Sequence, residues 1–169
     1  NGMDKSIVKE WIIECKQKEA RVFVDAEKST LKQAIKARPY LIKPNQEELE
    51  SITDKKFDNR EDMILECERI IENGVSVVVL SLGGEGAMFF SKENRLYAKA
   101  LDVPVNSTVG AGDSMMAAFA YGVQNNLTFE ETAKLSMAVS AAKVICEGTK
   151  MPDQEQIDDL LDKVQVKIL

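Results

Sequence analysis

The chain has 169 residues, a mass of 18.8 kDa, no histidine and a formal net charge of −6. This length can bury the core of one domain, and a hydrophobic fraction of 44% argues against a disordered chain. The absence of histidine excludes every mechanism that needs a histidine base, acid or metal ligand. An acidic pI near 4.9 argues against binding to nucleic acid or to an anionic membrane.

Three cysteines, Cys15, Cys67 and Cys146, stand far apart without a CxxC pair. An odd and scattered set predicts reduced thiols in a cytoplasmic protein, not a disulfide framework or a zinc site. We expect all three to be buried as small apolar side chains.

The predicted elements alternate between helix and strand and end in a block of helices. Apolar residues at helical spacing indicate helices, and short β-branched runs indicate strands. The predicted elements are a helix over 4–19 with Asp4 as its N-cap, a strand over 21–25, a helix over 28–37, a strand over 40–43, helices over 45–52 and 60–73, a strand over 75–81, a hairpin of 87–90 with 95–98, and helices over 110–121, 129–146 and 157–164. This order predicts an α/β fold with a mostly parallel sheet covered by helices.

The first of three polar motifs follows the predicted strand over 40–43. Asn45 and Glu48 are three residues apart and share one face of the first helical turn. An amide and a carboxylate at this place can hold Mg²⁺ through its waters. The alternative is a capping box, in which Asn45 caps the helix and Glu48 reaches back to it.

The second motif is the glycine-rich stretch from Ser81 to Gly86, after the most apolar predicted strand. Glycines allow a backbone to approach phosphate groups closely. The alternative is a plain turn that leads into the hairpin.

The third motif is the run of small residues from Asn106 to Ser114, which leads directly into a helix. Backbone amides of Gly110 to Asp113 are expected to be free at the helix N-terminus, where they would form an anion hole. Asp113 can then act as a general base for an incoming hydroxyl group while the amides stabilise a transferred phosphoryl group. The alternative is Asp113 as the N-cap of that helix.

Asn106 to Asp113 resembles the D/N-[ST]-T-x-G-A-G-D signature of the ribokinase-like (phosphofructokinase-B) family of sugar kinases. Asn45 to Glu48 matches the N-x-x-E motif of that family, and Ser81 to Gly86 matches its glycine-containing nucleotide loop. The three motifs stand in the family's order, and the resemblance covers essentially the whole chain. It implies a three-layer α/β/α fold that uses ATP and Mg²⁺.

The resemblance also implies roles for individual residues. Asp113 would take the proton of the sugar hydroxyl, and Gly110, Ala111 and Gly112 would form the anion hole with their amides. Glu48, with Asn45, would organise Mg²⁺ and the phosphates. The residues implied in nucleotide binding are Lys43, Asn45, Ser81, Gly83, Gly84, Glu85, Gly86, Ser136, Val139 and Ser140. The last three would border the adenine, and their alternative is a place in the core.

Within the family, the motifs are most similar to those of 1-phosphofructokinases, which implies transfer of the ATP γ-phosphoryl group to fructose 1-phosphate. Kinases of tagatose 6-phosphate or of another sugar are the alternatives. The family's first strands, its β-lid and its sugar-binding motif have no counterpart in this sequence. We therefore expect residues 1–169 to be the C-terminal, nucleotide-binding portion of such a kinase, with little activity alone, and its start at Asn1 to be a cut.

A non-enzymatic alternative is an isolated nucleotide-binding fragment that associates with itself through exposed sheet edges. The expected partners are a sugar phosphate and ATP, without nucleic acid or membrane, and a homodimer is left open. A nicotinamide-binding domain is disfavoured, because no GxGxxG motif stands at a strand–helix turn.

Overall fold

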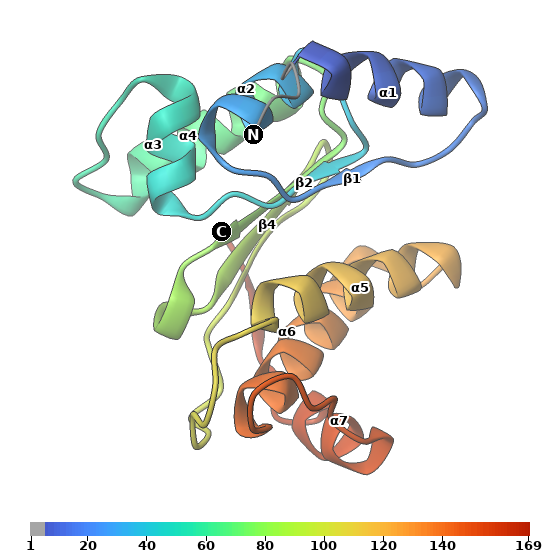
Figure 1. Ribbon diagram of the computed structural model, residues 1–169. Helices are drawn as coiled ribbons and strands as arrows, with labels where there is room; N and C mark the ends of the chain where they lie inside the picture. Colours follow the sequence, from blue (N-terminus) through green and yellow to red (C-terminus); the bar gives the residue numbers. More distant parts are fainter. Residues whose placement is uncertain (1–5) are drawn as a thin grey trace. The chain divides into compact units, whose positions relative to one another are not determined.

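The computed structural model describes residues 6–169 (Figure 1). The helices are α1 (Ser6–Gln17), α2 (Lys28–Ile35), α3 (Gln46–Thr53), α4 (Arg60–Glu72), α5 (Ala111–Gln124), α6 (Phe129–Ile145) and α7 (Gln154–Leu161), with a short 3₁₀ helix η1 (Gly83–Glu85). The strands are β1 (Phe23–Val24), β2 (Leu41–Ile42), β3 (Val77–Ser81), β4 (Ala87–Ser91), β5 (Arg95–Ala98) and β6 (Val166–Ile168). The α/β class predicted from the alternation of elements is confirmed.

The strands form one six-stranded sheet in the order β1-β2-β3-β4-β5-β6. β1, β2 and β3 are parallel, with Phe23 opposite Leu41 and Leu41 opposite Val77. β5 and β6 are antiparallel, with Tyr97 opposite Lys167. The sheet is therefore mixed, and its first three strands have the parallel arrangement that the alternating pattern predicts.

Several element boundaries differ from the predictions. β1 and β2 have two residues each, where the β-branched runs predict five and four. β3 begins at Val77 instead of residue 75, because the amide of Val75 donates to Ile70 O at the end of α4. β6 was not predicted, since its three residues are half-buried or exposed and show no continuous apolar run. The predicted N-cap Asp4 lies outside the described residues.

The chain divides into two compact units. Unit 1 extends to Ser81 and includes Phe89–Glu93, and unit 2 comprises Leu82–Met88 and Asn94–Leu169. In unit 1, Val77 to Leu80 of β3 are all buried, as expected of a strand covered on both faces. In unit 2, α5 packs on α6 and α6 packs on α7, with the rings of Phe119 and Phe129 edge to face at 5.9 Å.

The three cysteines are free, as predicted, but they differ in exposure. Cys67 is buried, and burial raises the pKa of its thiol. The prediction of burial is wrong for Cys15, which is exposed on α1, while Cys146 is half-buried.

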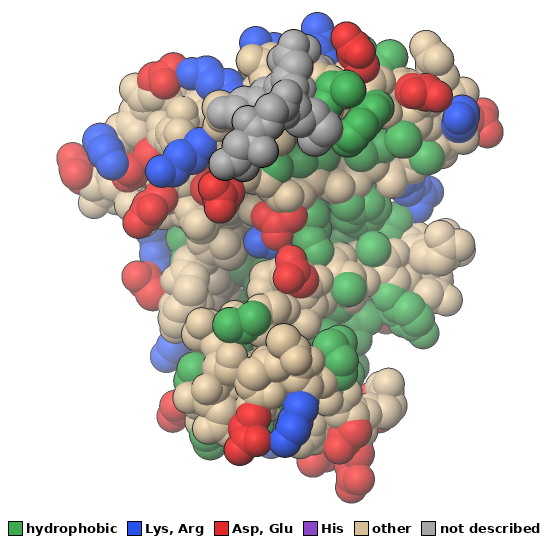
Figure 2. All heavy atoms as spheres, viewed as in Figure 1, with side chains coloured by type: hydrophobic (Ala, Val, Ile, Leu, Met, Phe, Trp, Pro, Cys, Tyr) green, Lys and Arg blue, Asp and Glu red, His purple; other side chains and the backbone are tan. Residues whose placement is uncertain are grey.

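Charged side chains of both signs are interspersed on the face drawn in Figure 2, without a continuous basic area. Among the described residues, no helix is both long and apolar enough to cross a membrane.

Candidate functional site

In unit 1, the motif after β2 lies beside the end of β3. Asn45 and Ser81 form an isolated parallel bridge. The Ser81 amide donates to Pro44 O at 2.9 Å, and the Ser81 hydroxyl donates to the same carbonyl at 3.4 Å. Two of the predicted nucleotide-binding residues, Asn45 and Ser81, are thus adjacent at the carboxyl ends of neighbouring strands, where open α/β sheets bind ligands.

Lys43 of the same motif is buried and already has a partner. It is 8% exposed, and its Nζ lies 2.9 Å from Oδ2 of Asp25. Asp25 follows β1 and Lys43 follows β2, and these strands are parallel neighbours, so the two charges meet at one edge of the sheet. Asp25 was not among the predicted site residues. One sequence signal could have identified it: two consecutive predicted strands end in residues of opposite charge, the first in Asp25 and the second in Lys43.

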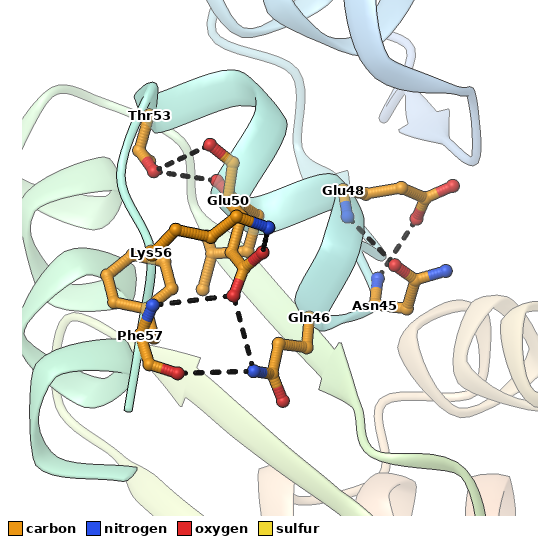
Figure 3. Close-up of polar contacts among 8 residues, drawn as sticks. Asn45, Gln46, Glu48, Glu50, Thr53, Lys56 and Phe57 are labelled. Atoms are coloured by element: carbon orange, nitrogen blue, oxygen red, sulfur yellow. Dashed lines mark hydrogen bonds and ion pairs between the residues drawn. The ribbon is translucent and has the colours of Figure 1, made fainter. Parts of the chain in front are cut away.

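Asn45 and Glu48 form the capping box that the spacing left as one alternative (Figure 3). The Glu48 amide donates to Asn45 Oδ1 at 2.8 Å, and the Asn45 amide donates to Glu48 Oε2 at 2.9 Å. Among residues 6–169, Glu48 Oε1 has no hydrogen-bond partner, and no group of three or more His, Cys, Asp or Glu side chains could hold a metal ion. Glu48 therefore suits an ion that takes most of its ligands from water and phosphate, as Mg²⁺ does.

A second polar cluster joins α3 to the loop that follows it (Figure 3). The Glu50 carboxylate accepts from Lys56 Nζ, from Gln46 Nε2 at 3.3 Å and from the Phe57 amide at 3.4 Å. The hydrogen bond from Lys56 is the main reason why the pKa of Glu50 is lower than usual. These groups satisfy one another, so this cluster holds α3 and the loop after it and offers no binding site.

In unit 2, the glycine-rich motif forms a closed turn around η1. The Leu82 amide donates to Gly86 O at 2.8 Å, and the Gly86 amide donates to Gly83 O at 3.1 Å. Gly86 has φ of 110°, and a Cβ there would lie 2.0 Å from Ala98 O. The turn that leads into β4 and β5 is confirmed, and the fold itself requires Gly86.

Gly84, at the exposed tip of the same turn, is different. Its φ is not in the left-handed region, and a Cβ at this position would meet nothing within 4 Å. The fold therefore does not require glycine at position 84. A residue without a side chain at an exposed tip suits close approach of a ligand to the backbone.

The motif before α5 is tied to the end of α6. The amides of Asn106 and Ser107 both donate to Val144 O, at 2.8 Å and 3.2 Å. The side-chain amide of Asn106 donates to Ile145 O at 2.7 Å. Carbonyl groups in the last turn of a helix have no partner within it, so this loop satisfies two of them and is held in place by α6.

α5 begins after Gly110, whose φ is 78° and which is the N-cap. Asp113 is the third residue of the helix, so the alternative of Asp113 as N-cap is wrong. Of the four amides expected to be free, that of Ala111 donates to Thr108 O at 3.2 Å. The amides of Gly110, Gly112 and Asp113 have no acceptor within residues 6–169.

The carboxylate of Asp113 is exposed, and no described residue donates to it or pairs with it. Free amides and a free carboxylate thus occupy the same helical turn. Such a turn can hold an anion at the amides while the carboxylate accepts a proton from a nearby hydroxyl group.

Lys143, near the end of α6, belongs to this region and was missed by the sequence reasoning. It is 3% exposed, and its Nζ donates to Gly148 O at 2.7 Å. Its Cε would lie 3.3 Å from a Cβ built on Gly110. The available signal was a lysine in an otherwise apolar stretch of the helix.

The three residues predicted to border the adenine lie on α6 with different exposures. Ser136 is fully buried, and its hydroxyl donates to Thr132 O at 2.8 Å. Val139 and Ser140 are half-buried. Only these two offer surface to a ligand, and all three assignments stay predictions.

Comparison with known proteins gives a consistent family assignment. The family described as "pfkB family carbohydrate kinase" matches residues 1–156. A 1-phosphofructokinase from Haemophilus influenzae is 31% identical over 169 residues, which cover 99% of this chain and 54% of that protein. The chain thus spans about half the length of the curated relatives it matches.

Solved structures show the same fold. Phosphofructokinase-2 from Escherichia coli, in complex with substrates and products, has a TM-score of 0.91 at 27% identity, over 96% of this chain and 53% of that one. The tetrameric inhibited form of the same enzyme has a TM-score of 0.87 at 26% identity, over 96% and 52% of the two chains.

Proposed function

The chain belongs to the pfkB family of carbohydrate kinases, and we propose that it carries the nucleotide-binding and phosphoryl-transfer part of an ATP-dependent sugar-phosphate kinase. One observation carries the proposal. In the first turn of α5, the amides of Gly112 and Asp113 and the carboxylate of Asp113 have no hydrogen-bond partner among residues 6–169. A helix N-terminus attracts phosphate, and a carboxylate held there without a partner is suited to proton transfer.

In the proposed reaction, Asp113 accepts the proton of a sugar hydroxyl group. The hydroxyl oxygen then forms a bond to the γ-phosphorus of ATP, and the bond between that phosphorus and the leaving oxygen of ADP breaks. The amides of Gly110, Gly112 and Asp113 donate to the oxygens of the transferred phosphoryl group, where negative charge is spread. Asp113 later releases its proton to solvent.

Each unit has one further motif to which we assign a role, the glycine-rich turn in unit 2 and the capping box of α3 in unit 1. The exposed tip at Gly83 and Gly84 lets a phosphate or ribose approach the backbone. Glu48 Oε1, with the side-chain amide of Asn45, would hold Mg²⁺ through its waters. Mg²⁺, when bound, would neutralise part of the phosphate charge.

We propose fructose 1-phosphate as the acceptor, since the curated relatives that cover nearly the whole chain are named 1-phosphofructokinases. A substrate panel on the full-length gene product tests this choice, with fructose 1-phosphate, fructose 6-phosphate and tagatose 6-phosphate as acceptors. A kcat/KM that is highest for fructose 1-phosphate supports the proposal. A preference for another sugar phosphate contradicts the acceptor and leaves the kinase assignment standing.

Nucleotide binding is tested separately by thermal unfolding with and without Mg·ATP. A ligand that binds only the folded state raises Tm, and at 100 times Kd it adds about 2.7 kcal/mol of stability. Gly84→Ala should unfold at the same temperature as the wild type without nucleotide but show a smaller rise in Tm with Mg·ATP.

No rise in Tm with millimolar Mg·ATP, in a folded sample, contradicts the proposal of nucleotide binding. An equal rise for Gly84→Ala and the wild type removes the glycine tip from the nucleotide site. The assembly of the protein is a further proposal: because a solved relative is described as tetrameric, light scattering should detect association of the chain.

A further inference from the structure

Lys143 has an environment that is unusual for a lysine. Its side chain is 3% exposed near the end of α6, although an ammonium group that leaves water loses several kcal/mol of hydration. Burial of such a charge normally requires a carboxylate partner. Within residues 6–169, no carboxylate pairs with Lys143, and Gly148 O at 2.7 Å is the acceptor of its Nζ.

The place of Lys143 connects it to the loop before α5. Its Cε lies against Gly110, the N-cap of α5, at 3.3 Å from the position that a Cβ would occupy. The next two residues of α6, Val144 and Ile145, accept the hydrogen bonds that hold Asn106 and Ser107. The end of α6 thus fixes this loop through its carbonyl groups and through the side chain of Lys143.

An ammonium group has three N–H donors, and the described residues use only one of those of Lys143. Its positive charge is therefore balanced by a carbonyl dipole instead of a full negative charge. A charge in a buried place acts more strongly on its neighbours than one in water. Since the Cε of Lys143 lies against Gly110, this charge is carried by a side chain that packs at the positive end of the α5 dipole, where the amides of Gly112 and Asp113 have no acceptor among the described residues.

We propose that Lys143 is a positioning residue for the phosphoryl transfer assigned above, on whose validity this inference rests. Its side chain holds Gly110 and Gly148 in place, so that the free amides of α5 stay aimed at the transferred phosphoryl group. The fixed positive charge of its buried ammonium favours binding of a nucleotide that has a γ-phosphoryl group over binding of one that lacks it. Lys143 acts through the amides and the local field, not by contact with the sugar.

The test uses Lys143→Met, Lys143→Gln and Lys143→Arg in the full-length gene product. Met removes both the charge and the hydrogen bond, Gln keeps a donor without the charge, and Arg keeps the charge. The matched control is Lys134→Met on the same helix, which removes the same charge from a lysine that pairs with Glu130 at 2.7 Å on the surface. We expect the control to leave kcat and nucleotide affinity unchanged.

For Lys143→Met and Lys143→Gln we expect kcat to fall about 10- to 100-fold, the scale of a small displacement of the reacting groups. ATP affinity should fall about tenfold while AMP affinity stays at the wild-type value, because AMP has no γ-phosphoryl group. Lys143→Arg should recover most of the ratio of ATP to AMP affinity. Circular dichroism and Tm establish whether each variant is folded. If Lys143→Met does not fold, the comparison is made with Lys143→Gln.

Other outcomes overturn the proposal. Wild-type kcat in Lys143→Gln shows that the charge is not needed. An equal loss of ATP and AMP affinity, with a lower Tm in all three variants, shows a purely structural role. If the wild type neither binds Mg·ATP nor transfers phosphoryl groups, the proposed function fails, and the role of Lys143 fails with it. If the wild type is active and Lys143→Met equals it, only the role of Lys143 is wrong.

Discussion

The two units satisfy their polar groups in different ways. At the strand ends of unit 1, Lys43 pairs with Asp25, and Asn45 and Glu48 cap each other. At the start of α5 in unit 2, the carboxylate of Asp113 has no partner among the described residues, and the amide of Gly112 has no acceptor there. Paired groups lose little when no ligand is bound, whereas unpaired groups gain most from a ligand.

Lys43 and Lys143, the buried lysines among the described residues, show the same difference between a paired and an unpaired charge. Lys43 is 8% exposed and is neutralised by a carboxylate at 2.9 Å. Lys143 is 3% exposed and has only a carbonyl oxygen, at 2.7 Å, within the described part of the chain. We therefore expect changes in unit 1 to affect mainly stability and metal dependence, and changes at the start of α5 to affect mainly turnover.

Asp113→Asn should have the largest effect on activity. Asn is nearly the same size and keeps the helix, but it cannot accept a proton, so kcat should fall about 10²-fold or more. ATP affinity and Tm should stay near the wild-type values, because Asp113 has no partner in the described structure to lose. The measurement is steady-state kinetics of the full-length gene product, with ATP binding by calorimetry.

The control for this prediction is Asp159→Asn, which makes the same change at an exposed position on α7. It should leave kcat unchanged. If Asp113→Asn turns over at nearly the wild-type rate, Asp113 is not the base, and its exposed carboxylate then has no assigned use.

Glu48→Gln separates the capping role of this residue from a role in Mg²⁺ binding. Gln at this position of a capping box can still accept from the N-cap amide, so Tm should change little. Loss of the negative charge should raise the Mg²⁺ concentration for half-maximal activity about tenfold, the low end for groups that hold a metal indirectly. The measurement is a Mg²⁺ titration at fixed ATP.

A matched control exists on α6, where Thr128 and Glu131 form the same kind of capping box. Glu131→Gln changes the same charge in the same motif, and it should not shift the Mg²⁺ titration. Equal titrations for the two variants would mean that Glu48 only caps α3.

Asp25→Asn should lower stability more than it lowers turnover. The change leaves the buried ammonium of Lys43 without a counter-charge, and breaking a fully buried ion pair costs about 3–5 kcal/mol. Because the Asp25 side chain is 33% exposed, we expect a smaller loss of about 1–2 kcal/mol in the free energy of unfolding. Urea denaturation measures this loss.

The exposed pair of Lys32 and Asp54 provides the comparison for Asp25→Asn. Asp54 has φ of 56°, a conformation that Asn also adopts readily, so Asp54→Asn removes the charge without backbone strain. We expect a loss below about 0.5 kcal/mol. Equal losses for the two variants would show that burial of Lys43 adds nothing to its ion pair.

Local patterns predicted the elements of this fold well, since helix periodicity and cap residues are properties of neighbouring residues. Spacing alone offered the capping box of Asn45 and Glu48 as one of two alternatives, and the place of Asp113 inside the first turn of α5 as another, and the structure shows both. The pairing of Asp25 with Lys43 and the contact of Lys143 with Gly110 depend on which strands and helices become neighbours. Such contacts join residues that are distant in the sequence, so a local pattern can single out one of these residues but does not show which residue it contacts.

The glycine-rich turn shows, within one motif, the same limit of prediction from local sequence. The sequence Gly83-Gly84-Glu85-Gly86 does not tell which glycine the fold requires. Only the approach of Ala98 O to Gly86, from the neighbouring strand β5, shows that this one has no room for a side chain. The fold does not require glycine at position 84, so we expect Gly84 to serve in ligand binding, and the Gly84→Ala experiment tests this.

The smallest expected effect is on the pH dependence of stability. In each unit, a carboxylate whose pKa is lowered in the folded state contributes to it: Glu50 in unit 1 and Glu131 in unit 2. In unit 1, the hydrogen bond from Lys56 lowers the pKa of Glu50 below its ordinary value of 4.5. In unit 2, the hydrogen bond from the Thr128 hydroxyl lowers the pKa of Glu131 in the same way. A carboxylate whose pKa is lower in the folded state contributes stability above its unfolded pKa and loses it as the pH falls through the folded pKa.

Stability of the wild type should therefore decline as the pH falls below about 4.5. Glu50→Gln and Glu131→Gln should each start from a lower stability at neutral pH and decline less steeply with acid, because Gln does not titrate. Urea denaturation between about pH 6 and pH 3 measures both slopes. Slopes parallel to that of the wild type would mean that these hydrogen bonds do not favour the charged carboxylates. A flatter slope in only one variant would mean that only that carboxylate has a lower pKa in the folded state than in the unfolded state.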